Sequence, residues 1–359
     1  MRALTIAQAA AAAAVLRRLV RGRTRHPPLT VPAERPRRTI SVVIPARDEA
    51  GRIGPCLRGL AGDPDLHEVL VVDDCSTDAT AATARAHGAR VIAGAEPPPG
   101  WVGKPWALQQ GLEAATGDVV VSLDADTRPR PGLARAMAAL LDGATPTFAT
   151  AGTRFICERF GERLLHPAML ATLVYRFGPS DAKGFVPAPD RVVSNGQCTA
   201  VERRRLLAAG GYRVVAGHMT DDAALARALA AGGWTVTFRD GGDLVEVDMH
   251  DSAAEVWREW GRSLALPDVT PARRQAEDLA IVWLTLALPP LRLLARRAGP
   301  LDLALLAVRA ALLGGLARAY TNRGAAFWLS PLADPAVAVR YTLSVFRPER
   351  RWRGRSYAA

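Results

Sequence analysis

From Thr39 onward, short β-branched runs alternate with stretches of helical character, and this alternation most limits what the chain can fold into. Runs of this kind suit strands that are buried on both faces of a sheet. Four are expected as strands: TISVVIP (39–45), EVLVVDD (68–74), ARVIAG (89–94) and DVVVSLD (118–124). Helices are expected between them over about 49–60, 76–88 and 103–117, the second capped by Ser76 or Thr77. Alternation at this spacing predicts a parallel, doubly wound α/β sheet.

Acidic residues follow three of the four expected strands. They are Asp48 and Glu49, then Asp73 and Asp74, then Asp124 and Asp126. Ligands of doubly wound sheets bind beyond the carboxyl ends of the strands, which is where these acids fall. The sequence therefore predicts a polar site at one edge of the sheet, with Glu49 and Asp74 available to a ribose or a base.

The DAD sequence at 124–126 is expected to bind a metal ion. Two carboxylates one residue apart can share a hard divalent cation and the diphosphate that it bridges. The motif is short and occurs by chance, so its position decides. Asp124 and Asp126 end a strand, whereas the other pair, Asp63 and Asp65, is expected in a loop.

Two further segments supply groups for chemistry. GWVGKPWALQQG (100–111) places Lys104 at a helix N-terminus, where backbone N–H groups and the ammonium favour phosphate. TDDAALARALAAGG (220–233) opens a helix with Asp221 and Asp222. Acids in a first turn also complement the helix dipole. A general base is still needed, and no Ser/His/Asp or Cys/His nucleophile set is visible in the sequence.

The later part of the chain mixes strand-like and apolar helical segments. WTVTFRD (234–240) and DLVEVDM (243–249) are expected as paired strands, and SAAEVWREWGRSL (252–264) as an amphipathic helix. Apolar blocks follow at 279–291, 303–317 and 324–339, the last two interrupted by Arg309 and Asp334. None reaches the roughly 18 uncharged residues of a clear membrane span. Either a soluble helical subdomain or membrane-associated helices fit, and the flanking arginines favour the membrane.

The charge and the cysteine content of the chain limit which binding partners and which cellular compartment are expected. The formal net charge is +11, and Lys104 and Lys183 are the only lysines. We interpret the arginine excess as a compositional bias and expect no nucleic-acid partner, because no nucleic-acid module is recognisable. The four cysteines show no metal-type spacing and are expected as buried thiols in a reducing compartment. The apolar stretch 4–16 precedes its arginines, which argues against a cleavable signal peptide.

Taken in order, SVVIPARDEA, VLVVDDCSTD, GKPWALQQG, VVSLDAD, NGQCTAVERRRLLAAGGY and TDDAALA resemble the family-two inverting glycosyltransferases. The resemblance covers roughly 39–264 and implies a GT-A fold, with a Rossmann-like, mostly parallel sheet. It implies that Pro45, Ala46, Glu49 and Asp74 hold the uridine of a UDP-sugar and that Lys104 lies in the nucleotide pocket. Asp124 and Asp126 would bind the diphosphate through Mg²⁺ or Mn²⁺, and Asp222 would be the base.

PPGWVGKPWALQQG and WREWGRSL are most similar to membrane-associated members that glycosylate lipids, including hopanoid-associated and carotenoid-type enzymes. A lipid acceptor and a cell-membrane location with the catalytic domain facing the cytoplasm follow as expectations. The division expected is an N-terminal apolar helix and linker (1–38), a GT-A domain (39–265) and an apolar helical region (266–359).

The sequence departs from the family at several places. Asp48-Glu49 replaces the usual Asn-Glu, and Asp221-Asp222 replaces Glu-Asp, which leaves the choice of base between the two aspartates open. The Gln-x-x-Arg-Trp motif is missing, so processive polymer synthesis is not expected. Three alternatives remain: a nucleotidyltransferase, an inactive relative that acts as a scaffold, and a basic binding protein. The first would typically have a Gly-rich basic loop after the first strand, and ARDEAGRIG lacks one. The sugar and the oligomeric state are not indicated.

Overall fold

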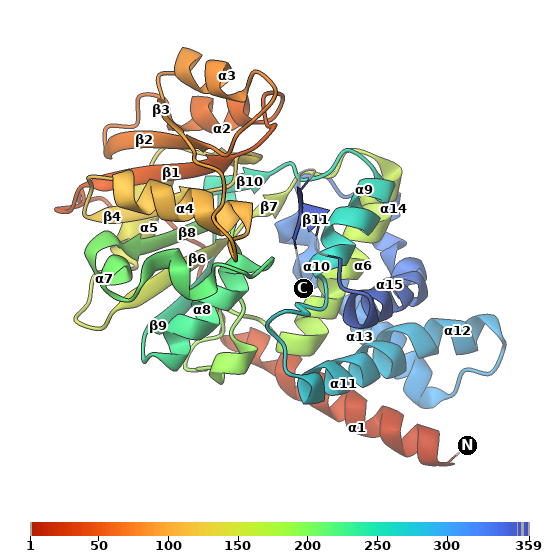
Figure 1. Ribbon diagram of the computed structural model, residues 1–359. Helices are drawn as coiled ribbons and strands as arrows, with labels where there is room; N and C mark the ends of the chain where they lie inside the picture. Colours follow the sequence, from red (N-terminus) through yellow and green to blue (C-terminus); the bar gives the residue numbers. More distant parts are fainter. Residues whose placement is uncertain (1, 350, 353–354, 358–359) are drawn as a thin grey trace. The chain divides into compact units, whose positions relative to one another are not determined.

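The computed structural model describes residues 2–349, 351–352 and 355–357, and it divides into two compact units (Figure 1). Unit 1 comprises Met1–Arg25, Phe155–Val186 and His250–Glu349. Unit 2 comprises His26–Arg154, Pro187–Met249 and Arg350–Ala359. Each unit is therefore assembled from segments that are far apart in the sequence. The functional division at residues 38 and 265 stays a prediction.

Unit 2 is built on a seven-stranded sheet with the order β3-β2-β1-β4-β8-β6-β9. Every neighbouring pair is parallel except those of β8, which runs antiparallel to both β4 and β6. The four predicted strands form one half of it, and the mostly parallel α/β fold is confirmed. The bounds are β1 Ile40–Ala46, β2 Leu66–Asp73, β3 Arg90–Ala93, β4 Val119–Leu123, β6 Thr147–Gly152, β8 Cys198–Glu202 and β9 Thr235–Asp240.

Helices cover both faces of this sheet because its strands are apolar on both sides. Val42 and Ile44 of β1 belong to the core that includes Leu57 of α2 and Met137 of α5. On the other face, Val43 lies against α4, the helix that carries Lys104. The helices of unit 2 are α2 Ile53–Leu60, α3 Thr80–Ala86, α4 Gly103–Ala114, α5 Leu133–Ala139, α7 Arg203–Ala208 and α8 Asp221–Ala231, with short 3₁₀ turns η2 Pro189–Arg191, η3 Gly211–Val215 and η4 Gly242–Leu244.

The expected pairing of the strands 234–240 and 243–249 is wrong. β9 pairs with β6 in parallel, while β10 (Val245–Val247) pairs antiparallel with β5 (Thr127–Pro129) in a small second sheet. The Gly241 N–H donates to the Gly152 carbonyl of β6 (2.8 Å), and η4 then turns the chain away. The segment between the two strands is thus held to β6, so it does not close a hairpin. β7 (Arg154–Phe155) marks the passage into unit 1.

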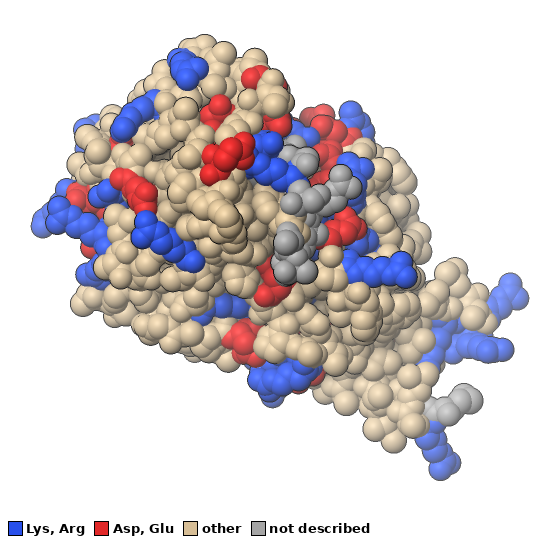
Figure 2. Space-filling view, viewed as in Figure 1, with Lys and Arg blue, Asp and Glu red and all other residues tan. Residues whose placement is uncertain are grey.

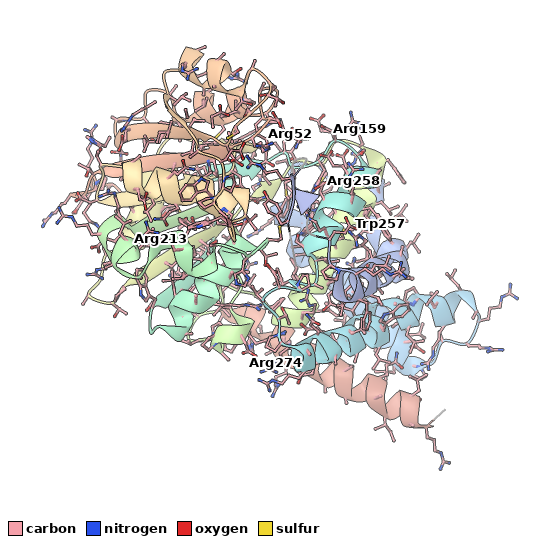
Figure 3. All side chains as sticks on the ribbon, in the orientation of Figure 1. Arg52, Arg159, Arg213, Trp257, Arg258 and Arg274 are labelled. Atoms are coloured by element: carbon pink, nitrogen blue, oxygen red, sulfur yellow. The ribbon has the colours of Figure 1, made fainter. Side chains whose placement is uncertain are left out.

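Unit 1 is mainly helical. The predicted helix 252–264 is observed as a continuous helical stretch over 253–263, with Trp257 and Arg258 on its π-helical middle (Figure 3). The elements are α1 Arg2–Leu19, η1 Val20–Thr24, α6 Phe160–Phe177, α9 Ala253–Glu255, η5 Val256–Trp260, α10 Gly261–Ser263, α11 Ala272–Ile281, η6 Val282–Ala287, α12 Leu288–Leu294, α13 Pro300–Leu316, η7 Ala317–Ala319, α14 Gly324–Trp328, η8 Ser330–Ala333 and α15 Asp334–Phe346. Two short strands, β11 Arg351–Trp352 and β12 Arg355–Ser356, belong to unit 2.

The two charges that interrupt the apolar blocks bind one another. Arg309 of α13 donates from Nε to Asp334 Oδ2 (2.8 Å) and from Nη2 to Oδ1 (3.0 Å), and each side chain is 2% exposed. A buried charge is tolerated when it is paired with good geometry. Residues 2–24 and 300–319 form helices long and apolar enough to cross a membrane by length and composition alone.

Gly111 sets how closely α4 approaches the sheet. A Cβ at this position would lie 2.3 Å from Val43 Cγ1 and 3.1 Å from Val72 Cγ2. We expect Gly111→Ala to lower the free energy of unfolding by about 1–3 kcal/mol, because overpacking outweighs the gain of roughly 1 kcal/mol in helix propensity. Chemical denaturation measures this effect. Gly143→Ala, which meets no atom within 4 Å, is the control, and an equal loss in both variants would contradict the packing argument.

Candidate functional site

The predicted nucleoside-binding residues meet at the carboxyl ends of β1 and β2. The two strands pair in register, so that Pro45 lies opposite Val72 and Ala46 opposite Asp73. The Asp74 N–H donates to the Ala46 carbonyl (2.8 Å), which places Asp74 beside the end of β1. Asp74 is 1% exposed. The edge of the sheet that the sequence predicts as polar therefore holds a buried carboxylate.

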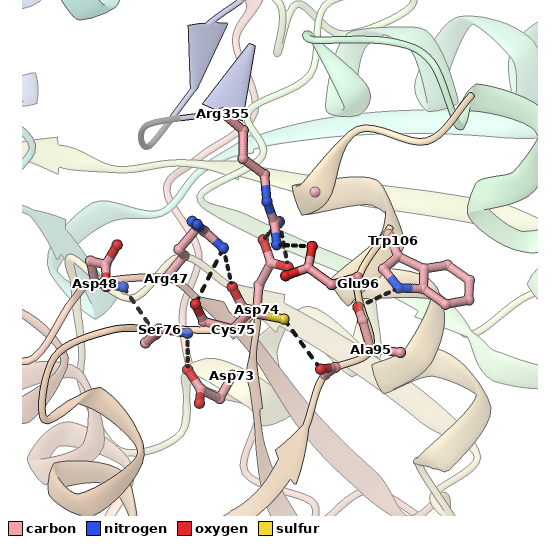
Figure 4. A network of polar contacts seen from close by, with 12 residues as sticks. Arg47, Asp48, Asp73, Asp74, Cys75, Ser76, Ala95, Glu96, Trp106 and Arg355 are labelled. Carbon is pink, nitrogen blue, oxygen red and sulfur yellow. Dashed lines mark hydrogen bonds and ion pairs between the residues drawn. The ribbon is translucent and has the colours of Figure 1, made fainter. Parts of the chain in front are cut away.

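The loops after β1 and β2 bind each other, and this corrects the predicted helix cap. Asp48 has a positive φ of 54°, and its N–H donates to Ser76 Oγ (3.0 Å) (Figure 4). Its Oδ1 accepts from the Thr77 N–H (2.8 Å). Neither Ser76 nor Thr77 caps α3. The helix begins at Thr80, whose N–H donates to Asp78 Oδ1 (2.9 Å). The two hydroxyl residues join the loops instead of starting the helix.

Lys104 and Asp124 form an ion pair between α4 and the end of β4. Their Nζ and Oδ1 atoms are 2.6 Å apart, and the side chains are 20% and 25% exposed. Burial alone would lower the pKa of Lys104, but Asp124, Asp221 and, more weakly, Asp222 outweigh it and raise that pKa. Lys104 is therefore a fixed cation that faces carboxylates from both β4 and α8.

Asp126 carries the features of a cation ligand. Its Oδ1 is buried without a hydrogen-bond partner among the described residues. Burial, then the charges of Asp124 and Glu49, raise its pKa to about 7. A divalent cation would neutralise this cluster, and carboxylate oxygens are the donors that Mg²⁺ and Mn²⁺ prefer, so the residues fit the expected metal. The described residues contain no group of three or more His, Cys, Asp or Glu side chains arranged for a metal.

The two aspartates that open α8 differ in exposure. Asp221 is 6% exposed, and burial raises its pKa to about 7 despite the opposing effect of Lys104. Asp222 is half-buried, and its Oδ2 accepts from the Gly196 N–H (2.9 Å). Burial also raises the pKa of Asp222. Asp222 is thus the more accessible of the two carboxylates.

Several residues of this region received no individual role from the sequence, although Asn195, Gly196 and Gln197 open one of the stretches that carry the resemblance. The Asn195-Gly196-Gln197 turn supports both acid pairs, because the Gln197 carbonyl accepts from the Asp124 N–H (3.1 Å) and Gly196 binds Asp222. Arg52, at the start of α2 (Figure 3), lowers the pKa of Asp126 by its charge. Arg355 binds Asp74. The turn at 195–197 could have been predicted, because Asn-Gly before a strand is a turn signal. Arg52 and Arg355 could not, because neither lies in a recognisable motif.

The other DxD pair has structural partners. Asp63 Oδ2 accepts from the Gly132 N–H (2.9 Å), and Asp65 forms an ion pair with Arg135 (2.6 Å). Both aspartates lie in the connection between α2 and β2, as expected. They bind that loop to the residues around α5, which leaves DAD as the DxD pair that follows a strand of the main sheet.

Comparison with known proteins shows which proteins the chain resembles. Residues 41–207 match the family described as Glycosyl transferase family 2. The solved mannosyltransferase PcManGT from Pyrobaculum calidifontis, in complex with GDP-Man and Mn²⁺, is similar with a TM-score of 0.55 and 22% identity over 97% of this chain and 98% of that one. The GT-A fold and the resemblance drawn from the motifs are confirmed.

Among curated proteins the chain is similar to 4,4'-diaponeurosporenoate glycosyltransferases. The Staphylococcus haemolyticus protein is 24% identical over 254 residues, which are 68% of this chain and 66% of that protein. A Staphylococcus aureus protein is 37% identical over 90 residues, 25% of this chain and 24% of that protein. The chain thus matches between a quarter and two thirds of the length of these relatives.

Asp126 should determine the affinity for a divalent cation. We expect Asp126→Asn to weaken Mn²⁺ binding, measured calorimetrically in the presence of UDP, by at least about tenfold, because one charged oxygen ligand is lost. Asp65→Asn alters the other DxD pair, whose carboxylate is bound to Arg135, and should leave Mn²⁺ affinity unchanged. Equal Mn²⁺ affinity in the wild type and Asp126→Asn would remove the metal role from DAD.

Proposed function

We propose that this protein is an inverting glycosyltransferase that moves a sugar from a nucleoside-diphosphate donor, a UDP-sugar, to a hydroxyl group of a lipid acceptor. The observation that carries the proposal is the Lys104–Asp124 ion pair, which interacts electrostatically with half-buried Asp126 and with the α8 carboxylates. This arrangement combines a cation for phosphate, an acid pair for a metal and a carboxylate for proton transfer. The family of residues 41–207 supports the same reaction class.

The proposed reaction is a single in-line displacement at the anomeric carbon. Asp222 takes the proton from the acceptor hydroxyl as the hydroxyl oxygen attacks, and its raised pKa makes it a better base than an ordinary carboxylate. The Gly196 N–H fixes the orientation of the Asp222 carboxylate by binding its Oδ2. Lys104 binds the leaving diphosphate in this proposal, and its fixed positive charge supports that role. A Mg²⁺ or Mn²⁺ ion held by Asp124 and Asp126 would supply Lewis-acid stabilisation of the departing nucleoside diphosphate.

The lipid acceptor is supported by the surface of unit 1. Among the side chains that the structure describes, all but two of the exposed large hydrophobic ones lie in unit 1, the exceptions being Val31 and Val214. Ile6 of α1, Leu294 of α12 and Phe346 of α15 are 70%, 75% and 69% exposed. Exposed arginines accompany them, at positions 2, 296 and 297 (basic side chains are blue in Figure 2). Apolar side chains with neighbouring arginines suit an anionic membrane surface.

A direct test of the function incubates the protein with radiolabelled nucleotide sugars and a lipid extract in the presence of Mn²⁺. UDP-sugars are expected to label a lipid with release of UDP. GDP-sugars are tested beside the UDP-sugars as comparison donors, because the similar mannosyltransferase was solved in complex with GDP-Man. Turnover of free sugar-1-phosphate with a nucleoside triphosphate would identify a nucleotidyltransferase instead. Absence of transfer from every donor would favour the inactive scaffold.

The role of Asp222 can be separated from that of Asp221. Asp222→Asn keeps the size and hydrogen bonding of the side chain but removes its basicity, so kcat should fall by about a hundredfold or more with unchanged donor affinity. Asp221→Asn should reduce kcat less, because that carboxylate is buried. Turnover and UDP-sugar affinity are measured for both variants. Near-normal turnover of Asp222→Asn, or a loss confined to donor binding, would exclude Asp222 as the base.

Membrane association should depend on the exposed apolar side chains of unit 1. We expect Ile6→Asp, Leu294→Asp and Phe346→Asp each to weaken flotation with anionic lipid vesicles by at least about tenfold, because burial of a large apolar side chain is lost. Val214→Asp makes the same kind of change at a 47% exposed position in unit 2 and serves as the control. Equal flotation of all four variants would contradict a membrane-binding surface on unit 1.

A further inference from the structure

Arg355, near the C-terminus, binds the carboxylate proposed to hold the donor nucleoside. Its Nη1 donates to both Asp74 oxygens at 2.7 Å, and its Nη2 donates to Glu96 Oε2, also at 2.7 Å (Figure 4). The Asp74 side chain is 1% exposed and that of Arg355 is 15% exposed. Contacts between ionised groups are strong when they are shielded from water in this way. Arg355 is thus the cation that balances a buried carboxylate.

Tyr357 extends the same contact to the start of α4. Its hydroxyl oxygen accepts from the Gly103 N–H (3.1 Å), one residue before Lys104. A Cβ at Gly103 would lie 2.7 Å from Asp74 Oδ2, 3.0 Å from Arg355 Nη1 and 3.1 Å from the Tyr357 hydroxyl. Three groups from two distant parts of unit 2 therefore converge on one glycine. The convergence joins the end of β2 to the helix that carries the phosphate-binding lysine.

We propose that residues 355–357 complete the nucleoside end of the donor site, with Arg355 acting as a positioning residue for Asp74. This inference rests on the proposed function. A carboxylate has about four acceptor positions, so Asp74 can bind Arg355 and still accept hydrogen bonds from the ribose or base. Arg355 also neutralises Asp74 and Glu96, which would otherwise face an anionic donor. The C-terminal segment thereby becomes part of the binding site, although it lies far from the family-two domain in the sequence.

The pKa of Asp74 gives a way to test the role of Arg355 that does not depend on the stability of the fold. Burial raises its pKa, whereas Arg355 and then Arg47 oppose that rise, and Glu96 adds to it. The neighbouring Cys75 has a raised pKa of its own, through burial and Glu96. Removing Arg355 should therefore raise the pKa of Asp74 further. Donor binding that needs ionised Asp74 would then be lost at a higher pH as the solution is made more acidic.

The test is calorimetric titration of the full-length protein with UDP in the presence of Mn²⁺, across a range of pH. We expect Arg355→Gln to raise the Kd for UDP by about tenfold and to shift its acid-side loss to higher pH. Arg355→Lys should recover part of the affinity because it keeps the charge. Arg90→Gln is the control, since Arg90 forms an exposed ion pair with Glu68 at the opposite end of the strands. Tyr357→Phe, which removes one hydroxyl, should give a smaller loss of UDP affinity. If Arg355→Gln does not fold, this variant tests whether the C-terminal residues contribute to UDP binding.

Each outcome separates this inference from the function on which it rests. Wild-type protein that binds neither UDP nor GDP would overturn the proposed function itself. Wild-type binding with unchanged affinity and pH profile in Arg355→Gln and Tyr357→Phe would overturn only the role of the C-terminal segment. Tighter UDP binding in these variants would also overturn it, because it would show that the segment competes with the donor.

Discussion

The site depends on one ammonium group placed among carboxylates. Lys104 touches Asp124 and lies close enough to Asp221 and Asp222 for each to affect its pKa. Without this cation, the ends of β4 and α8 would bring like charges together in a half-buried environment, which is unfavourable unless the acids take up protons. In the proposed function, the same cation also binds the diphosphate of the donor. One lysine would then make the acid cluster compatible both with folding and with an anionic substrate.

The half of the sheet that contains β1, β2 and β4 could be predicted from the sequence, because the signals for these strands are local. Each of β1, β2 and β4 is rich in β-branched residues and has an acid at its end or within two residues after it, and parallel strands bring such ends together. β8 gave no such signal, since the antiparallel direction of Cys198–Glu202 is set by its pairing with β4 and β6. The same holds for Ser76, whose sequence context fits a helix cap. Its actual partner, the Asp48 N–H, is 28 residues away.

The division into two units shows a different limit of sequence reading. Charge within an apolar block counts against burial when the block is considered alone, and Arg309 and Asp334 each interrupt one. In the structure they form a buried pair, so the two interruptions compensate each other. Arg176 and Asp278 do the same between α6 and α11, where both side chains are fully buried. The second of these pairs joins α6 to a helix after residue 250, two segments that composition assigns to different regions but that both belong to unit 1.

The contact between Asp74 and Arg355 joins residues 281 positions apart, and no motif marks the second of them. A boundary drawn at residue 265 therefore separates a carboxylate from its counter-ion, although every family motif lies before it. A chain shortened there would lose α11 to α15 from unit 1 and the Asp74 partner from unit 2. It would leave a buried carboxylate with Glu96 beside it and without its main cation, which favours protonation of Asp74. Unit 2 therefore extends past residue 265 and includes residues at the far end of the chain.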